Sequence, residues 1–480
     1  MPDTAPHFSG KRWKAPNISI ASISGNIKNH NVYVADLVLK RQNVKGTILK
    51  LLKKYKPEIV GLSAMTFQFD TSWKIAQLIK KINKDIKTVL GGYHVTLMYD
   101  EISNNGYSEP FDFLVRGEGD LSFNELLEAY EGKRDINNIP GISFKVNGKF
   151  IHNPPRPLED LNKINLPDRS KRIFKGYHYY GFKLDIVESS RGCTMPCNFC
   201  SIDKMYGKNF RMYNIDRVLK DIDDAKKHGA DFIIFTDDNF SLNVKRFEDL
   251  CDAMVDSGHN DIKYIIQASS TGIASSNTLA EKMARAGFRI VFLGIENVSK
   301  ENLKNLRKGN IIEKTKIAVK RLHEQEIMIV GGMIIGHPND KEENIAQNYE
   351  FFVKLDIDFF ADQILTPYPK TPLREEMIKS DLVTNKDNFS RYNCFWSNIR
   401  TNYLSADELQ FLRWKYNKKY AVYICTTKAF IKNYPAAYYY RIYFRRPYFK
   451  LKNKFFNGKL TERELYEKDM KKAEEMNIFL

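Results

Sequence analysis

The sequence lacks a long apolar run, a secretory signal and a pairing pattern among its cysteines. It contains no uninterrupted run of about 18 apolar residues, so we expect no membrane-spanning helix. Residues 1–16 are polar and lack the apolar centre of a signal peptide. Six cysteines without a pairing pattern are typical of the reducing cytosol. We therefore expect a cytoplasmic protein.

Solenoid-type repeats and low-complexity tracts are also absent, and the size of the chain indicates several domains. A length of 480 residues exceeds one ordinary domain, and a hydrophobic content of 43% is that of a soluble globular protein. We expect a tail over 1–16, a Rossmann-like domain over 17–138, a linker over 139–180, a partial barrel over 181–378 and a helical domain over 379–480.

The first part alternates between strand and helix patterns, which predicts an α/β fold with a parallel, doubly wound sheet. Strands are expected over 18–23, 59–64, 87–90 and 113–115, and helices over 44–54, 71–83 and 122–130. Small-residue loops follow three of these strands, at Ser63, Gly91 and Gly117. Because ligands bind such sheets at the carboxyl ends of the strands, these loops mark the expected binding edge.

The expected linker carries a hairpin-like turn at Asn147-Gly148 and a stiff, proline-rich stretch over 153–157. A second series of alternating elements follows it. Its strands are expected over 184–188, 232–236, 263–267, 290–294, 328–335 and 360–365. Six strand–helix units predict an incomplete TIM-type barrel, whose active residues lie at the carboxyl ends of the strands.

Three cysteines follow the first of these six strands in a C-x3-C-x2-C pattern: Cys193, Cys197 and Cys200. Gly192 and Pro196 favour a tight loop, so the three thiolates can converge on one soft metal centre. A [4Fe–4S] cluster is held by thiolates, and a set of three leaves one iron open for a small molecule. Zinc competes, but structural zinc takes a closed tetrahedral set, and no paired Cys or His follows at zinc spacing. The remaining alternative is three ordinary cysteines.

This triplet, with the aromatic Phe199 before its last cysteine, resembles the signature of the radical S-adenosylmethionine (SAM) enzymes. The resemblance extends from about Asn17 to about Ile378. It is closest to the cobalamin-binding branch, which includes proteins similar to the anaerobic magnesium-protoporphyrin monomethyl ester cyclase. It implies a [4Fe–4S] cluster on the three cysteines, SAM on the open iron and cobalamin on the N-terminal domain.

The resemblance also implies SAM contacts at the ends of the later barrel strands. Asp237, Asp238 and Asn239 offer carboxylate and amide groups to the ammonium or ribose of SAM. Gln267 and Ser269 end the third strand, and Glu296, after the fourth, can accept from ribose hydroxyls. The alternative for the aspartate pair is a helix N-cap, which Asp also favours.

The run Gly332-Met333-Ile334-Ile335-Gly336 resembles the G-x-I-x-G element that contacts adenine through its backbone. Gly332, Ile334 and Gly336 are the expected contacts, whereas Met333 is a better candidate for the core. Relatives often carry an arginine after the glutamine of the third strand, but the run here is Gln267-Ala268-Ser269-Ser270. The missing charge leaves the type of substrate open.

The run over 25–30 lacks the D-x-H-x-x-G motif through which some cobalamin domains ligate cobalt. The three loops nevertheless match the cobalamin-binding branch, and glycine lets the backbone approach a flat corrin closely. The expected contacts are Ser63, Met65, Thr66, Gly91, Gly92, Tyr93, His94, Arg116, Gly117, Glu118 and Gly119. For His94 the alternatives are an amide or tail contact and a plain surface histidine. The domain could instead bind nothing and serve only to dock.

The formal net charge is +17, and 18 basic against 8 acidic residues lie from Arg400 to Leu480. The same segment is rich in Tyr and Phe between 434 and 456. Such a composition suits an anionic membrane surface or single-stranded nucleic acid, of which we favour the membrane. The alternative is a helical cap that packs its aromatic rings on the barrel and keeps Lys in water.

Together these features predict a radical SAM enzyme that methylates an unactivated carbon of a hydrophobic or anionic small molecule. The methyl group would pass from methylcobalamin to a substrate radical, and a reduced flavodoxin or ferredoxin-type protein would supply electrons. One alternative is oxidative ring formation or C–C coupling of the porphyrin-cyclase type. Another is a cobalamin-binding sensor or carrier with a structural metal. The methylthio-transferring relatives are disfavoured, because no cysteine precedes Cys193.

Overall fold

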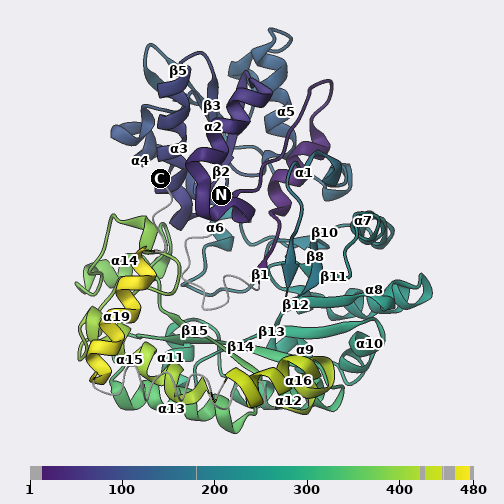
Figure 1. Ribbon diagram of the computed structural model, residues 1–480, viewed down its shortest axis with the longest axis vertical. Helices are drawn as coiled ribbons and strands as arrows, with labels where there is room; N and C mark the ends of the chain where they lie inside the picture. The colour runs from purple at the N-terminus through teal and green to yellow at the C-terminus, as the bar shows by residue number, and fades with distance from the viewer. Residues whose placement is uncertain (1–12, 180, 422–426, 446, 448–459, 476–480) are drawn as a thin grey trace.

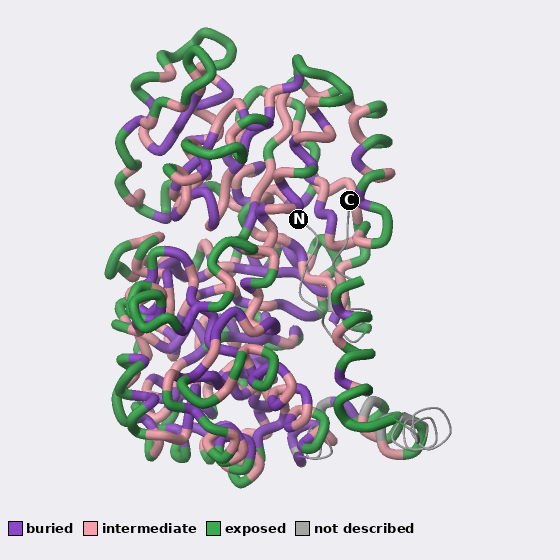
Figure 2. Tube along the Cα trace, turned by 90° about the vertical axis from the view of Figure 1, so that its left-hand side faces the viewer, coloured by how far each residue is buried: buried purple, intermediate pink, exposed green. Residues whose placement is uncertain are grey.

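The computed structural model describes residues 13–179, 181–421, 427–445, 447 and 460–475 (Figure 1). It contains a five-stranded sheet in the N-terminal part and an eight-stranded sheet in the central part. Figure 2 shows buried residues concentrated inside the larger, lower body and exposed residues over its outer surface. In the described part of the chain, no helix combines the length and the apolar character needed to cross a membrane.

The N-terminal sheet has the order β2-β3-β4-β5-β6. Its parallel strands are β2 (Ile59–Ser63), β3 (Lys87–Gly91) and β4 (Phe113–Val115). The strands β5 (Ile142–Val146) and β6 (Lys149–His152) are antiparallel, and β5 pairs with β4. The expected turn connects β5 to β6, and Asn147 and Gly148 both have positive φ there. The hairpin therefore extends this sheet, although it lies in the segment that we expected to be a linker.

Helices cover both faces of this sheet, as a doubly wound fold requires. They are α2 (Val44–Tyr55), α3 (Phe69–Ile82), α4 (Tyr93–Asn104) and α5 (Gly119–Tyr130). Phe69 of α3 and Val95 of α4 share one apolar cluster with Leu90 of β3. Leu126 of α5 packs on the opposite face, against Val89 of the same strand. Neighbouring residues of β3 therefore pack on opposite faces of the sheet, each against its own layer of helices.

The predicted strand over 18–23 is wrong, because these residues lie in helix α1 (Ile18–Asn26). Asn17 caps the helix by accepting a hydrogen bond from the backbone N of Ile20 at 3.1 Å. The alternation of Ile and Ser is the pattern of a half-buried strand. In the helix, however, the buried hydroxyls of Ser22 and Ser24 both have hydrogen-bond partners. Ser22 donates to Asp120, and Ser24 donates to the carbonyl of Ala21.

The central sheet is a partial barrel of six parallel strands, as expected. They are β8 (Phe182–Val187), β11 (Phe232–Phe235), β12 (Lys263–Ser269), β13 (Phe288–Glu296), β14 (Met328–Ile335) and β15 (Phe359–Ile364). Each pairs in parallel with its neighbours in this order. The short strands β1 (Trp13–Lys14) and β7 (His178–Tyr179) extend the edge beyond β8 in antiparallel fashion.

The outer layer of the barrel consists of helices that follow its strands. They are α7 (Ile215–Lys227), α8 (Val244–Asp256), α9 (Ser270–Ser275), α10 (Leu279–Arg285), α11 (Lys300–Asn305), α12 (Ile312–Glu324), α13 (Glu342–Lys354) and α14 (Pro372–Lys379). The main core lies between these helices and the strands.

The described C-terminal part is helical, with α15 (Ala406–Tyr420), α16 (Lys428–Asn433), α17 (Pro435–Tyr440), a π-helical turn (Arg441–Arg445) and α19 (Glu462–Glu475). Phe430 and Tyr434 pack against Phe232, Ile265 and Met328 at the amino ends of the barrel strands. Part of the aromatic segment is therefore a cap. Cys425 and the aromatic residues Tyr448, Phe449, Phe455 and Phe456 lie outside the described residues.

Candidate functional site

The two domains enclose a cavity of about 330 Å³ where the carboxyl ends of their strands meet. The N-terminal domain contributes Met65, Thr66, Phe67 and Tyr93, and the loop of the cysteine triplet contributes Phe199, Cys200, Ser201 and Ile202. Ile334, Gln363, Ile364, Leu365, Thr366, Tyr368 and Cys394 complete the lining. Tyr93 and Ser201 also form a hydrogen bond across the domain boundary. Loops from both predicted binding edges therefore share one cavity.

The cysteine triplet lies in a loop between the short strand β9 (Ser190–Arg191) and helix α6 (Ile202–Tyr206). Gly192 has a φ of +90°, and a methyl group there would lie 2.3 Å from the carbonyl oxygen of Asn209. This position therefore requires glycine. Cys193, Cys197 and Cys200 are free and partly buried thiols.

The thiols are held in a setting that favours metal ligation. Burial raises the pKa of Cys193 and of Cys197, and it raises the pKa of Cys200 to about 12. The charges of Cys197 and Cys193 raise the pKa of Cys200 further, so the three groups lie near one another. Three neighbouring, partly buried thiols with raised pKa values ionise together only when positive charge is supplied, and a bound metal centre supplies it.

The donor set fits a cluster better than a single ion. Among the described residues, no group of three or more His, Cys, Asp or Glu side chains could hold one metal ion. A cubane spreads its ligands over different irons, so its thiolates need not converge as closely as those around one zinc. The three free thiols on one loop therefore suit a [4Fe–4S] cluster.

The polar residues after β11 hold the triplet loop in place. Asp237 is fully buried and accepts hydrogen bonds from Ser189 N (3.0 Å), Ser189 Oγ (2.6 Å) and Ser190 Oγ (2.5 Å). Asp238 accepts from Gly192 N at 2.9 Å, and the side chain of Asn239 hydrogen-bonds Cys193. Burial raises the pKa of each of the two aspartates to about 6. These contacts do not match the alternative of a helix N-cap.

A positive charge beside the triplet comes from a lysine that sequence reasoning missed. Lys308 Nζ lies 2.8 Å from Glu296 Oε1, and both side chains are largely buried. Burial lowers the pKa of Lys308, but the charges of Glu296, Cys197 and Cys193 more than offset this and raise it. Glu296 has a φ of +66° at a register shift between β13 and β14, a strained backbone that is common at functional sites.

The other predicted barrel residues take different positions. Ile334 lines the cavity, whereas Gln267 is exposed on β12 and Ser269 caps α9 by accepting from Gly272 N. Gly332 leaves room for the ring of Phe292, and Gly336 (φ +89°) leaves room for Leu409. Met333 is fully buried, as expected of a core residue.

The loops after β2 and β3 face the cavity. Met65 is 44% exposed, while Thr66 is 1% exposed and its hydroxyl has no hydrogen-bond partner among the described residues. Gly92 has a φ of +96°, and a methyl group there would lie 2.9 Å from the backbone of Ala64 and 3.0 Å from Ser63 Oγ. Gly91 is the last residue of β3, directly before the loop that begins at Gly92. An unsatisfied hydroxyl beside a glycine-built loop fits a bound polar cofactor such as the corrin.

His94 is not a surface histidine, so that alternative is wrong. It is 1% exposed, lies between the rings of Phe69 (4.5 Å) and Phe389 (5.0 Å), and burial lowers its pKa to about 3. Its Nδ1 has no hydrogen-bond partner among the described residues. His94 is therefore a neutral residue packed behind the loop.

The loop after β4 connects structural elements. Arg116 is buried and donates to the carbonyls of Ile142 and Asn153, which ties β4 to the hairpin. Gly117 (φ +74°) and Glu118 line a second cavity of about 220 Å³ with Arg116. A methyl group on Gly119 would lie 3.1 Å from Ile23 of α1. These residues are absent from the lining of the shared cavity.

Comparisons with known proteins assign both domains. A model of the Radical SAM superfamily matches residues 187–352, and a model of the B12 binding domain matches residues 13–127. An uncharacterised methyltransferase of Pyrococcus horikoshii is 31% identical over 425 residues, which cover 87% of this chain and 90% of that protein. This chain belongs to the cobalamin-binding radical SAM enzymes. Its cofactors are therefore a [4Fe–4S] cluster, SAM and cobalamin.

Other relatives agree with this assignment. The anaerobic magnesium-protoporphyrin IX monomethyl ester cyclase of Rubrivivax gelatinosus is 29% identical over 74% of this chain and 64% of its own length. The radical SAM methyltransferase TsrM from Kitasatospora setae, with cobalamin and a [4Fe-4S] cluster bound, matches the fold with a TM-score of 0.65 at 19% identity, over 76% of this chain and 77% of its own. The cobalamin-dependent radical enzyme OxsB matches with a TM-score of 0.68 at 17% identity, over 86% and 66%. As a radical SAM enzyme, this protein needs a reductant and a substrate.

Proposed function

We propose that this enzyme methylates an unactivated carbon of a hydrophobic or anionic small molecule bound in the shared cavity. When bound, the cluster supplies the electron that cleaves SAM, and cobalamin supplies the methyl group. The observation that carries the proposal is the lining of the cavity by cobalamin-domain loops and the cluster loop together. Phe67, Phe199, Ile364 and Leu365 make much of this lining apolar, which favours a hydrophobic substrate.

The residues of the barrel mouth divide the work of holding the cluster and SAM. Cys193, Cys197 and Cys200 would hold three irons, and Asn239 would steady the sulfur of Cys193 with its hydrogen bond. Lys308 places a cation beside the cysteines, which suits the carboxylate of SAM. Glu296, held by Lys308 at 2.8 Å, would accept from the ribose hydroxyls.

Product analysis tests the proposal. Anaerobically purified, iron- and sulfide-reconstituted protein is supplied with cobalamin, SAM and titanium(III) citrate. We expect both S-adenosylhomocysteine and 5′-deoxyadenosine. Deoxyadenosine alone would favour cyclisation or coupling, and the absence of both would leave only a carrier.

The cysteine assignment has a matched control in the same chain. Cys197→Ala should abolish the charge-transfer absorption of the cluster and the formation of deoxyadenosine. Cys251→Ala should keep both, because Cys251 is a fully buried core residue of α8. Equal loss in the two variants would contradict the assignment.

We further propose a reduced flavodoxin or ferredoxin-type donor and a peripheral contact with an anionic membrane. A formal net charge of +17 favours docking of an acidic electron carrier. For the membrane, α17 and the π-helical turn expose four aromatic residues: Tyr439 (53%), Tyr440 (51%), Tyr443 (66%) and Phe444 (67%). Exposed aromatic rings in a basic segment suit the interface of an anionic bilayer.

A further inference from the structure

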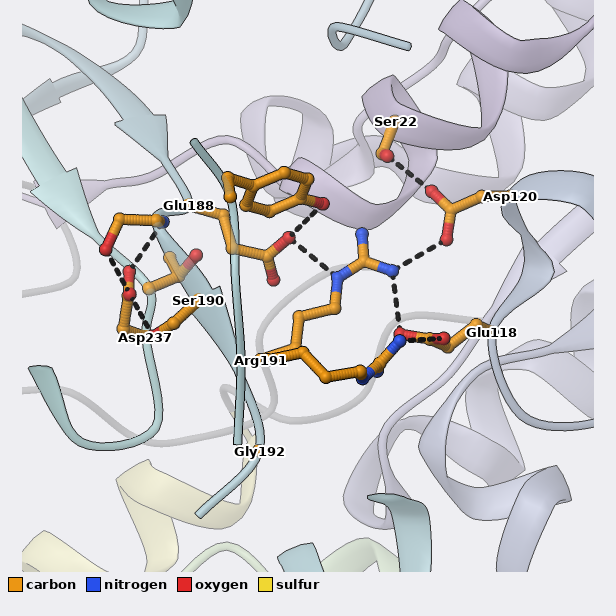
Figure 3. A network of polar contacts seen from close by, with 12 residues as sticks. Ser22, Glu118, Asp120, Glu188, Ser190, Arg191, Gly192 and Asp237 are labelled. Carbon is orange, nitrogen blue, oxygen red and sulfur yellow. Dashed lines mark hydrogen bonds and ion pairs between the residues drawn. The ribbon is translucent and has the colours of Figure 1, made fainter. Parts of the chain in front are cut away.

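Arg191 joins the two domains immediately ahead of the cluster loop. From Nη1 it donates to Glu118 and to Asp120 of the N-terminal domain, each at 2.9 Å. From Nε it donates to Glu188 of the barrel at 2.8 Å. Figure 3 shows the guanidinium between these three carboxylates, and its side chain is 8% exposed. One buried cation therefore bridges the domains.

The carboxylates of the N-terminal domain are fixed by further contacts. Asp120 lies in the first turn of α5 and also accepts from Ser22 of α1 (Figure 3). Glu118 also accepts from Arg211 of β10 (Arg211–Met212) at 2.7 and 3.0 Å, and β10 pairs with β9. Two guanidinium groups thus face three largely buried carboxylates, and removing one guanidinium leaves like charges facing each other.

The chain on both sides of Arg191 is equally fixed on the barrel side. Asp237 binds Ser189 and Ser190 just before it, and Asp238 accepts from the N–H of Gly192 just after it. Gly192 is wedged against the carbonyl of Asn209. Asp237 and Asp238 thus hold the chain ahead of Cys193 on the barrel without the guanidinium, and Arg191 adds the link to the N-terminal domain.

We propose that Arg191 is a positioning residue that sets the spacing between the cluster loop and the cobalamin-binding loops. The inference rests on the proposed function, because the spacing between these loops would matter for methyl transfer between the cofactors that they would hold. Loss of the contact should leave SAM cleavage intact and impair methyl transfer across the cavity. Substitution of Asp120 tests the same contact from the N-terminal domain, because Asp120 lies 71 residues from Arg191 in the sequence and outside the cluster loop.

Hydrogen–deuterium exchange on the cofactor-free protein measures how far the contacts of Arg191 stabilise the cluster loop and helix α5. In Arg191→Gln and in the isosteric Asp120→Asn, residues 190–206 and 119–130 should both exchange faster than in the wild type. Arg172→Gln is the matched control, because Arg172 is 7% exposed and pairs with Asp185 of β8 at 2.6 and 3.0 Å. It should leave both segments unchanged.

The reconstituted enzyme gives the second measurement. Arg191→Gln and Asp120→Asn should keep their iron and cobalamin content and their rate of deoxyadenosine formation. Formation of S-adenosylhomocysteine should fall by about tenfold or more, since a misplacement of about 1 Å can cost that much. The spin-relaxation enhancement of cob(II)alamin by the reduced cluster should weaken in parallel. Arg191→Lys should give an intermediate ratio of the two products, and Arg172→Gln the wild-type ratio.

Each failure has its own signature. If the wild type binds no cobalamin or does not cleave SAM, the proposed function is wrong. If the wild type does both, and Asp120→Asn leaves the exchange, the relaxation enhancement and the product ratio unchanged, Arg191 does not set the spacing. A second outcome would also overturn the inference. In it, Arg191→Gln loses iron and forms less of both products, whereas Asp120→Asn is unchanged. The effect of the substitution would then lie in the cluster loop alone.

Discussion

Single buried side chains near the cavity have proton affinities far from their ordinary values, and the shifts act in opposite directions on stability. Burial raises the pKa of Asp237 and of Asp238 from 3.8 to about 6. Between these two pH values the folded state binds more protons than the unfolded state, so these aspartates favour folding as the pH falls. Burial lowers the pKa of His94 to about 3, so here the unfolded state binds the extra proton. Of these three residues, only His94 favours unfolding as the pH falls.

His94→Leu should flatten the fall of stability with acidification. Because the pKa of His94 drops from 6.5 unfolded to about 3 folded, its contribution is complete above pH 6.5 and is lost as the pH falls towards 3. Between pH 7 and pH 5 the wild type should lose about 2 kcal/mol more of its free energy of unfolding than the variant. Urea denaturation at the two pH values measures this, and equal losses would mean that His94 is protonated in the fold.

The sequence alone predicts those site residues whose spacing or place after a strand indicates their role. The cysteine triplet and the polar groups after β11 could be found because spacing and strand ends are visible in sequence. Lys308 could not, because it follows Lys300, Lys304 and Arg307 in a polar stretch typical of a solvated surface. Its pairing with Glu296 arises from tertiary packing, as does the bridge that Arg191 forms to Asp120.

At the scale of elements, the six barrel strands were predictable and α1 was not. Buried parallel strands are continuous apolar runs, so the positions of the six strands followed from composition, with ends that differ from the observed ones by up to two residues. The run over 18–26 carries alternating Ile and Ser, a pattern that period alone assigns to a strand. The helix forms instead because Asn17 caps it and because Asp120 satisfies the buried Ser22.

The cap makes α1 sensitive to one substitution. Asn17→Ala should lower the free energy of unfolding by about 1 kcal/mol, because the Oδ1 that accepts from Ile20 N is lost. The backbone N of Asn17 still donates to Asp36, so the variant isolates the cap. Asn17→Ser retains a capping oxygen and should stay close to the wild type in the same denaturation experiment. An equal loss in both variants would show that the side chain acts other than as a cap.

At the scale of the whole molecule, the carboxyl ends of two sheets meet over one cavity, and the C-terminal segment closes the opposite end of the barrel. This facing of the two sheets is what methyl transfer between the two expected cofactor sites requires. The division of the aromatic segment did not, because composition alone cannot separate rings that pack from rings that face water. Phe430 is 7% exposed against the strands, whereas Phe444, in the same segment, is 67% exposed.

This division predicts that two aromatic substitutions in one segment have different consequences. Phe430→Ala should lower the free energy of unfolding by about 3 kcal/mol, because it opens a cavity beside Phe359 and Tyr434. Tyr443→Ser with Phe444→Ser should change it by less than about 0.5 kcal/mol, since both rings face solvent. Sedimentation with phosphatidylglycerol vesicles should show the reverse order, with about tenfold weaker binding for the double variant and wild-type binding for Phe430→Ala below its unfolding transition. Undiminished sedimentation of the double variant would remove the membrane contact and leave the segment as a cap alone.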